Sequence, residues 1–183
     1  MMKKAIKIFG TTLLVVVLFR GLIFRSLIEY QEIGTRSLIE LMDERLIEKI
    51  KAKSNKSLLG ISKIVKIADS VTRQELSFTF KKASCNPNEL IETKKANCIG
   101  YSAMFNSIAS YLIIKNNLQT EFSAEHLVGK IDFFGLDMHQ YFDDPFYKDH
   151  DFNIIKNLKT GVELIIDPTV SDYLWIDRVT LNK

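Results

Sequence analysis

The stretch from residue 97 to residue 112 constrains the fold most strongly, because it carries the signals of one buried helix. Asn97 is a favoured N-cap residue, since its side chain can accept a hydrogen bond from a free N–H group of the first turn. Large apolar side chains then recur at steps of four, three and four residues, the spacing of one helix face. They are Tyr101, Phe105, Ile108 and Leu112. The pattern predicts an amphipathic helix that begins at residue 98.

Cys98 falls in the first turn of this predicted helix. A thiol at that place lies beside unpaired backbone N–H groups and the positive end of the helix dipole. Both favour the thiolate, which is the nucleophilic form of cysteine. Position alone slightly favours a second interpretation, in which Cys98 is a small buried hydrophobic residue, as free cysteines often are.

Two downstream blocks bear on this choice. The segment 149–155 contains His150 followed by alternating apolar residues, and the segment 165–169 ends in Asp167-Pro168-Thr169. The cysteine, histidine and aspartate are separated by 52 and 17 residues. This ordered set resembles the transglutaminase-like branch of the papain-like cysteine enzymes, whose blocks read roughly Cys-x-x-Tyr/Phe-Ala/Ser, His-x-x-Asn and Asp-Pro-Thr. The resemblance covers about residues 61–173, and it departs from the family where Asn97 replaces a frequent Gly and Phe152 a common Trp.

The resemblance implies a catalytic triad. Cys98 would be the nucleophile, His150 would exchange protons with it, and Asp167 would orient the imidazole. The backbone N–H of Cys98 is a natural donor to the oxyanion. The implied reaction is acyl transfer or hydrolysis at an amide bond of a protein or peptide through a Cys98 thioester. A small chain without a calcium-loop pattern favours a peptidase or amidase over a crosslinking enzyme.

Other residues compete for these roles. His126 lies in a predicted strand, where we expect it to be a satisfied sheet residue, and His139 lies in a loop that could line the cleft. Asp149 and Asp151 flank the catalytic histidine, but Asp151 should point to the opposite face of its strand. We expect Asn153, which matches the last position of His-x-x-Asn, to have a structural role.

Two other functions stay open. The chain could be a non-catalytic, membrane-anchored binding or scaffold module that retains the fold, or a membrane assembly factor that uses helices in the segment 35–70. Net charge is only +3 and the basic residues are dispersed, which gives no indication of nucleic-acid binding. The sequence contains no CxxC, HExxH or Gly-rich phosphate loop, so it predicts no metal and no cofactor. Two cysteines cannot form a disulfide framework, and we expect Cys85 to be unpaired.

The N-terminal segment has the composition of a signal anchor. Lysines at positions 3, 4 and 7 precede an apolar run from Ile8 to Phe24 that only Arg20 interrupts with a charge. No small-x-small cleavage site follows, so we expect an uncleaved transmembrane helix with a cytoplasmic N-terminus and an extracytoplasmic domain. Arg20 and Arg25 would snorkel at the far interface. The alternative is an amphipathic helix that lies on the membrane or packs on another domain.

These features predict an α+β fold with a papain-like, transglutaminase-type core, in which helices pack on an antiparallel sheet behind a membrane anchor. The predicted units are an anchor (1–30), a helical segment (31–73) and the core (74–183). Helices are expected at 35–53 and from Ser57 to about Ser70. Strands are expected at 76–80, as a central strand at 122–133, as a hairpin of 152–155 with 162–166, and as a last strand or packing segment at 173–176. The loop 135–148 is either one wall of the cleft or a peripheral insertion.

Overall fold

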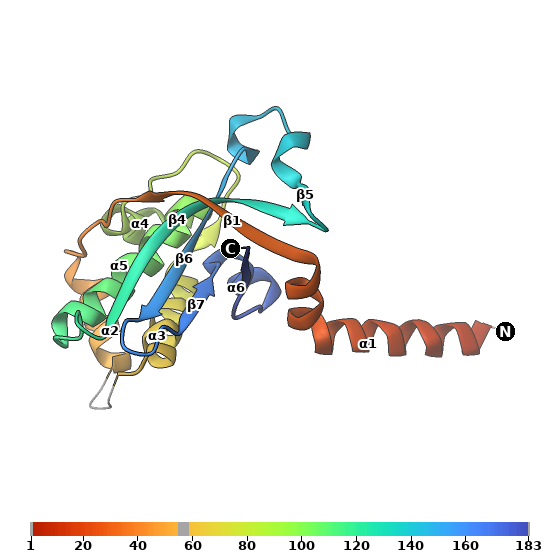
Figure 1. Cartoon of the computed structure of the whole chain (residues 1–183), viewed down its shortest axis with the longest axis horizontal. Coiled ribbons are helices and arrows are strands. Elements are labelled where there is room, and N and C mark those ends of the chain that lie inside the picture. The colour runs from red at the N-terminus through yellow and green to blue at the C-terminus, as the bar shows by residue number, and fades with distance from the viewer. Residues whose placement is uncertain (1, 55–58, 183) are drawn as a thin grey trace.

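The computed structural model describes residues 2–54 and 59–182 of the chain. Its elements run from an isolated N-terminal helix through alternating helices and strands (Figure 1). In chain order they are α1 (Met2–Leu27), β1 (Ile28–Arg36), α2 (Glu44–Ser54), α3 (Ile61–Glu75), β2 (Ser77–Phe78), α4 (Pro87–Thr93), β3 (Lys95–Ala96), α5 (Cys98–Lys115), β4 (Phe122–Phe133), β5 (Leu136–Asp137), η1 (Met138–Tyr141), η2 (Pro145–Tyr147), β6 (His150–Asn157), β7 (Glu163–Ile166), α6 (Pro168–Leu174) and β8 (Thr180–Asn182). The fold class is α+β, as predicted.

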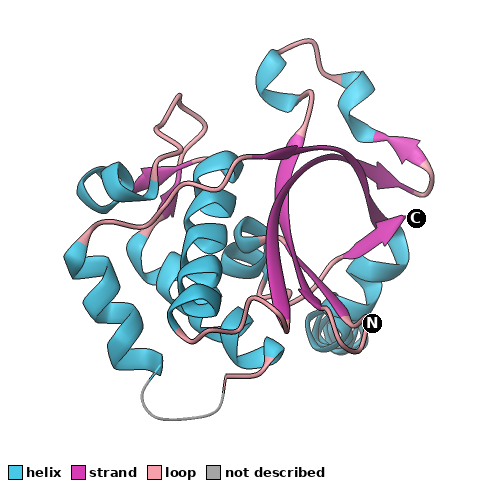
Figure 2. Ribbon diagram, turned by 60° about the vertical axis from the view of Figure 1, so that its left-hand side comes forward, coloured by secondary structure: helices cyan, strands magenta, loops and turns pink. Residues whose placement is uncertain are grey.

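The main sheet has the strand order β7-β6-β4-β1-β8, and the short β5 pairs with the end of β4. Neighbouring strands are antiparallel except β1 and β8, which are parallel. The sheet curls strongly, with most helices gathered on one side of it (Figure 2). Its two edges approach each other, and the Val179 N–H donates to the Ile165 carbonyl at 3.0 Å. The sheet is therefore nearly closed.

Helix α5 is the centre of the main core. It packs against α3 on one side and against β4 and β6 on the other. Its largest buried side chains are Tyr101, Met104, Phe105, Ile108 and Leu112. Burying a large apolar side chain contributes about 1.5–3 kcal/mol, so this one helix supplies a sizeable share of the driving force for folding. The predicted helix is confirmed, and it ends at Lys115 before the Asn116-Asn117 pair.

The central strand and the hairpin are also confirmed. β4 spans Phe122–Phe133 and pairs with β6 in a register that places Gly129 opposite His150. A Cβ atom at Gly129 would clash with the Gln31 carbonyl and the Phe152 ring, so only glycine fits at this crossing. A second apolar cluster lies around Phe152 and also includes Tyr30, Leu127 and Val179.

The helix predicted at 35–53 is wrong in its first half. Residues 28–36 form β1, and the helical part is α2, which begins at Glu44. In β1 the alternation of Tyr30, which is buried, with Glu29 and Gln31, which are exposed, fits a strand between β4 and β8. Pairing on both sides outweighs the local helical spacing. The predicted boundary at residue 30 therefore falls inside a strand of the main sheet.

Two smaller predictions are met only in part, and the cap of the second helix falls outside the described residues. Ser57, the expected cap of the second helix, lies outside the described residues, and α3 begins at Ile61. The strand expected at 76–80 is reduced to the two residues of β2, which pair with β3. The segment 173–176, expected as a last strand or packing segment, includes the end of α6. This helix forms because the Asp167 carboxylate accepts hydrogen bonds from the N–H groups of Thr169 and Val170, while Pro168 occupies the first turn.

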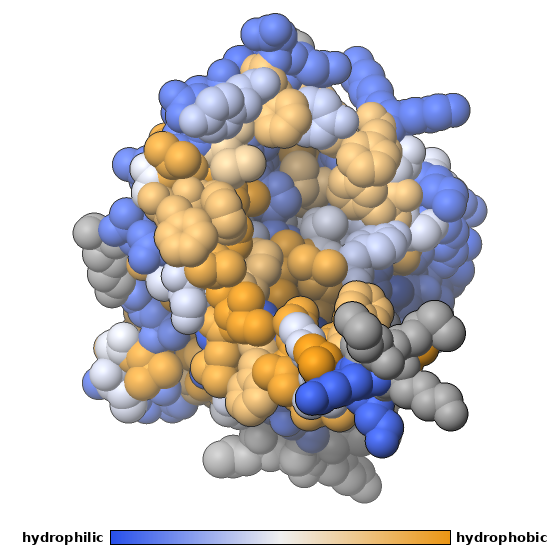
Figure 3. All heavy atoms as spheres, turned by 90° about the vertical axis from the view of Figure 1, so that its right-hand side faces the viewer, coloured by the Kyte–Doolittle hydropathy of each residue, from blue (hydrophilic) through white to orange (hydrophobic). Residues whose placement is uncertain are grey.

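Helix α1 contains a stretch, Ile6–Leu27, that is long and apolar enough to cross a membrane. It has 22 residues and a mean hydropathy of 2.0, and none of its most apolar part is buried. The helix projects away from the rest of the chain, and its N-terminus is the far end (Figure 1). Figure 3 views the molecule from the side on which α1 projects toward the viewer, and apolar side chains gather at the centre of this view.

Candidate functional site

The N-terminus of α5 holds Cys98 in a fixed position. The Asn97 side chain accepts a hydrogen bond from the Gly100 N–H at 3.3 Å and caps the helix, as predicted. A Cβ atom at Gly100 would press on Ala96 and on the Ser84 carbonyl, so glycine allows the first turn to sit against the preceding chain. The Cys98 side chain is 8% exposed and lines a cavity, so it does not face a closed core.

The structure brings Cys98, His150 and Asp167 together. His150 is the first residue of β6, and Asp167 directly follows β7, the neighbouring strand. The Nε2 atom of His150 lies 2.6 Å from Oδ2 of Asp167. The Cys98 thiol and this imidazole line the same cavity, and their interaction contributes to the pKa of His150. Since Nε2 already contacts the carboxylate, the nitrogen that is left for Cys98 is Nδ1.

Tyr30 is a fourth member of this cluster, which the sequence did not reveal. Its hydroxyl donates to Oδ2 of Asp167 at 2.7 Å, the oxygen that also contacts His150. Its ring lies edge-on to His150, with a centroid separation of 5.9 Å. The other carboxylate oxygen accepts from two backbone N–H groups at the start of α6. Asp167 therefore has four donors, and its orientation is fixed. The sequence signal that could have placed Tyr30 in the sheet was the period-two alternation of polar and apolar residues around it.

The opposite charges of His150 and Asp167 stabilise each other. Burial alone would lower the pKa of His150, but the charge of Asp167 and the hydrogen bonds with Asp167 and Cys98 raise this pKa well above its usual value. Burial would raise the pKa of Asp167, but the charge of His150 and the hydrogen bonds from His150 and Tyr30 hold it below its usual value. Burial and the nearby carboxylate raise the pKa of Tyr30, so the phenol stays protonated and donates. The arrangement favours an imidazolium between a carboxylate and the thiol.

The cavity at Cys98 has a volume of about 240 Å³ and is lined mainly by aromatic and other apolar side chains. Several of them come from the insertion 135–148, which therefore forms a wall of the cleft, as one of the two interpretations predicted. These are Met138, Phe142, Phe146 and Tyr147. Phe78 and Phe80 also line the cavity, and the rings of Phe80 and Phe146 lie 6.2 Å apart.

His139 lines this cavity, as the sequence allowed, but it is not beside the thiol in the role of His150. Its Nδ1 atom lies 2.6 Å from the Tyr147 carbonyl, which can only accept. The proton of the neutral ring is therefore on Nδ1, and Nε2 is an acceptor. Among the residues that the structure describes, Nε2 has no hydrogen-bond partner. His139 thus holds the insertion in place and leaves one acceptor in the wall.

The second histidine–aspartate pair belongs to the other face of the strand. His126 Nε2 lies 2.6 Å from Oδ2 of Asp151, and Arg36 binds the same carboxylate with two nitrogens. Both predictions are confirmed: His126 is satisfied within the sheet, and Asp151 points away from His150. Burial would raise the pKa of Asp151, but hydrogen bonds from His126 and Arg36 lower it. Asn153 is fully buried, and its amide has no partner within the described ranges.

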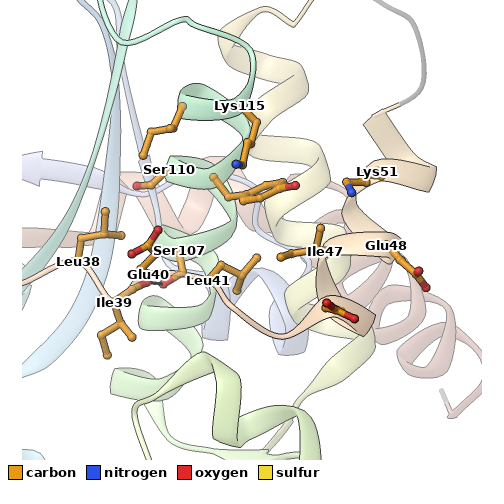
Figure 4. Close-up of a pocket in the computed structure, with 13 residues that line it drawn as sticks. Leu38, Ile39, Glu40, Leu41, Ile47, Glu48, Lys51, Ser107, Ser110 and Lys115 are labelled. Atoms are coloured by element: carbon orange, nitrogen blue, oxygen red, sulfur yellow. Dashed lines mark hydrogen bonds between the residues drawn. The ribbon is translucent and has the colours of Figure 1, made fainter.

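A larger cavity, of about 650 Å³, lies on another side of α5 (Figure 4). It forms where the chain between β1 and α2 crosses α5, and the Ser107 hydroxyl donates to the Ile39 carbonyl at 2.5 Å within it. Its rim is charged, with Glu40, Glu48 and Lys51 (Figure 4). None of the three clustered residues lines it. The candidate site therefore lies at the smaller cavity, which Cys98 and His150 line.

Both cysteines are free, with Cys85 exposed and Cys98 buried. Across the described ranges, no group of three or more His, Cys, Asp or Glu side chains is placed to hold a metal ion. Comparison of the chain with protein-family models, with curated proteins and with solved structures found no match.

Proposed function

We propose that the protein catalyses thiol-dependent hydrolysis or transfer at an amide bond, through a thioester on Cys98. The observation that carries the proposal is the Cys98–His150–Asp167 cluster, whose thiol and imidazole line one cavity. We propose further that the core is of the papain-like, transglutaminase type. A cysteine at a helix N-terminus, a histidine that opens an antiparallel strand and an aspartate after the next strand support this.

The reaction would take two steps. In the first, the Cys98 thiolate attacks the amide carbonyl, the C–N bond breaks, and the His150 imidazolium gives its proton to the leaving amine. In the second, neutral His150 takes a proton from water, whose oxygen attacks the thioester; the C–S bond breaks, a carboxylic acid leaves, and the Cys98 thiolate and His150 imidazolium are restored. The Cys98 backbone N–H would stabilise the oxyanion in both steps. Asp167 keeps the imidazole oriented and stabilises its cationic form.

The cavity supports a protein or peptide substrate with a large apolar side chain beside the scissile amide. Pockets for drug-sized ligands have volumes of about 300–1,000 Å³. The cavity, at about 240 Å³, suits a single side chain, and its aromatic walls suit an apolar one. Water needs no binding surface of its own, so hydrolysis is the favoured outcome, with transfer to an amine as the alternative.

We also propose that α1 is a single-pass anchor that holds the protein in a membrane. The lysines at positions 3, 4 and 7 would keep the N-terminus cytoplasmic, so the domain would lie on the extracytoplasmic side. Full-length protein should stay in membranes after a carbonate wash. Full-length protein that is recovered only in the soluble fraction would contradict the anchor.

An activity-based thiol probe tests the reaction. The full-length protein should be labelled at Cys98, and labelling should be lost in Cys98→Ala and greatly reduced in His150→Ala. Cys85→Ala is the matched control, since Cys85 is exposed and outside the cavity. If Cys98→Ala retains the label, or if Cys85→Ala loses it, the catalytic assignment fails and a binding or scaffold function replaces it.

A further inference from the structure

The apolar composition of α1 suits a bilayer, but the part of the helix before Arg20 is shorter than the hydrocarbon core. Ile6–Leu27 would span about 33 Å at 1.5 Å per residue. However, the part that precedes Arg20, from Ile6 to Phe19, is only about 21 Å long, while the hydrocarbon core is about 30 Å thick. If α1 crosses the membrane, the span before Arg20 is therefore about 9 Å shorter than the core, and the bilayer must thin locally to bring its far hydrocarbon boundary to Arg20.

The sequence suggested that Arg20 would snorkel toward water at this depth. Its side chain instead contacts the C-terminal part of the chain. Its guanidinium donates to the carbonyls of Leu174 and Trp175 at 3.0 and 3.1 Å and to the Val17 carbonyl at 2.8 Å. It also lies over the Trp175 ring, 5.9 Å from the centroid. These contacts offset the cost of removing a charge from water. The residues that bind Arg20 must therefore be at the same depth as Arg20.

Further contacts hold the end of α1 to the C-terminal part of the chain. Arg25 lies 3.6 Å from the Asp177 carboxylate, and the Thr180 hydroxyl donates to the Arg25 carbonyl at 3.3 Å. The segment 173–178 thus cannot move away from the helix without losing several hydrogen bonds. The position of α1 in a membrane would set the position of this segment.

The surface of the segment suits a membrane interface. Leu174 and Trp175 are large exposed side chains next to Arg20 of α1, and Trp175 is 64% exposed. Tyr173 is also exposed, and its hydroxyl accepts a hydrogen bond from the Phe78 N–H at 2.8 Å. Trp175 caps α6 in a left-handed conformation, with φ of 53°, at a position where glycine is the usual residue. Tryptophan and tyrosine concentrate where the headgroups meet the hydrocarbon, because their rings are apolar and their N–H or O–H groups are polar.

We propose that residues 173–175 form a second membrane contact, which seats the domain on the headgroup region of the bilayer with the Trp175 ring at the interface. This inference rests on the membrane-spanning assignment of α1, but not on the chemistry of Cys98. The occupant of this surface is lipid, because the short span before Arg20 brings the bilayer to it. The face shown in Figure 3 is then the face that approaches the membrane.

The chain offers a direct reporter, because Trp175 is its single tryptophan. The full-length protein would be reconstituted in phosphatidylcholine vesicles whose acyl chains carry bromine either near the headgroup or near the terminal methyl. Bromine near the headgroup should quench the Trp175 emission at least about twofold more strongly than bromine near the methyl, as for interfacial tryptophans. Arg20→Gln should weaken this quenching, because the segment loses its tie to the helix.

The matched control moves the tryptophan to a distant surface. In Trp175→Phe combined with Leu158→Trp, the reporter lies on the turn between β6 and β7, at a side chain that is 53% exposed, and neither brominated lipid should quench it. If carbonate releases the protein, the spanning assignment and this inference fail together. If the protein is retained but Trp175 is not quenched, this inference alone fails. A Trp175 emission that changes with the protein-to-lipid ratio would identify a second copy of the chain as the occupant instead, and would equally overturn it.

Discussion

Replacing Tyr30 with phenylalanine removes one hydroxyl from the site and leaves the ring in place. The hydroxyl donates to the buried Asp167 carboxylate at 2.7 Å, and a hydrogen bond to a charged group contributes about 1.5–3 kcal/mol. Because the ring volume is nearly unchanged, no cavity is created. We expect the free energy of unfolding to fall by about this amount. For a chain of this size, the melting temperature should fall by about 2–4 °C per kcal/mol.

The same change should alter the titration of His150. Without the Tyr30 donor, the Asp167 carboxylate becomes more basic and holds the imidazolium more strongly, so the pKa of His150 should rise further. The chain has three histidines, so NMR of the ring C–H groups of the full-length protein in micelles can follow each one. In Tyr30→Phe the His150 signal should titrate at higher pH than in the unchanged protein.

Tyr101→Phe provides the matched control. Tyr101 is also fully buried, and its hydroxyl donates to the Asp172 carboxylate at 2.9 Å, outside the cluster. We expect it to cost stability without changing the His150 titration. If both variants lose stability and neither changes the titration of His150, Tyr30 is a structural residue only, and its assignment as a positioning residue is refuted.

Three further predictions concern the charges and thiols. His150→Ala should slow the alkylation of Cys98 by iodoacetamide at neutral pH and leave that of the exposed Cys85 unchanged; mass spectrometry reads both sites, and an unchanged rate at Cys98 would refute the dyad. Since the pKa of His150 is raised in the folded protein, its stabilising effect is complete below about pH 6.5, the unfolded value, and is lost as the pH rises through the folded pKa. His150→Gln should remove this alkaline loss in urea unfolding, and an unchanged loss would contradict it. Asp151→Asn should lower the free energy of unfolding by about 3 kcal/mol, because it leaves the buried His126 without its carboxylate; a loss below about 1 kcal/mol would show that the network is not stabilising.

The parts of the site that depend on local order were predictable. Asn97 caps α5 and Cys98 follows it. Both features could be predicted because the cap residue and the roughly 3.6-residue period of apolar side chains lie in one short stretch of sequence. His150 and Asp167 come together because a hairpin with a short turn must place its two strands side by side. Asp151 faces the opposite side of the sheet for the same reason, since successive side chains alternate.

The parts that depend on distant pairing were not predictable. Nothing near Tyr30 indicates Asp167, because the two residues meet only when β1 lies between β4 and β8. The segment 35–53 has apolar residues near helical spacing, but residues 35 and 36 pair in the main sheet as the end of β1. Arg20 and Arg25 were expected to contact lipid and water. They contact the segment 174–178 instead, more than 150 positions away in the chain.

The position of β1 also shows where the predicted anchor unit of residues 1–30 can be cut. Removing all of it would remove the first three residues of β1 and the Tyr30 hydroxyl. We expect a variant that begins at Ile28 to keep the sheet and a variant that begins at residue 31 to lose stability. Urea unfolding of the two proteins, which differ by three residues, measures the contribution of the strand end.

The sandwiching of β1 between β4 and β8 also sets an order for folding during synthesis. Residues 28–36 leave the ribosome first, but their partners are about 100 and 150 residues further along. Until then both edges of β1 are unpaired, and contacts between such distant residues form slowly because a long loop must close first. The Tyr30–Asp167 hydrogen bond therefore cannot form until most of the chain has been made. The nascent chain carries its thiol well before the site around it is assembled.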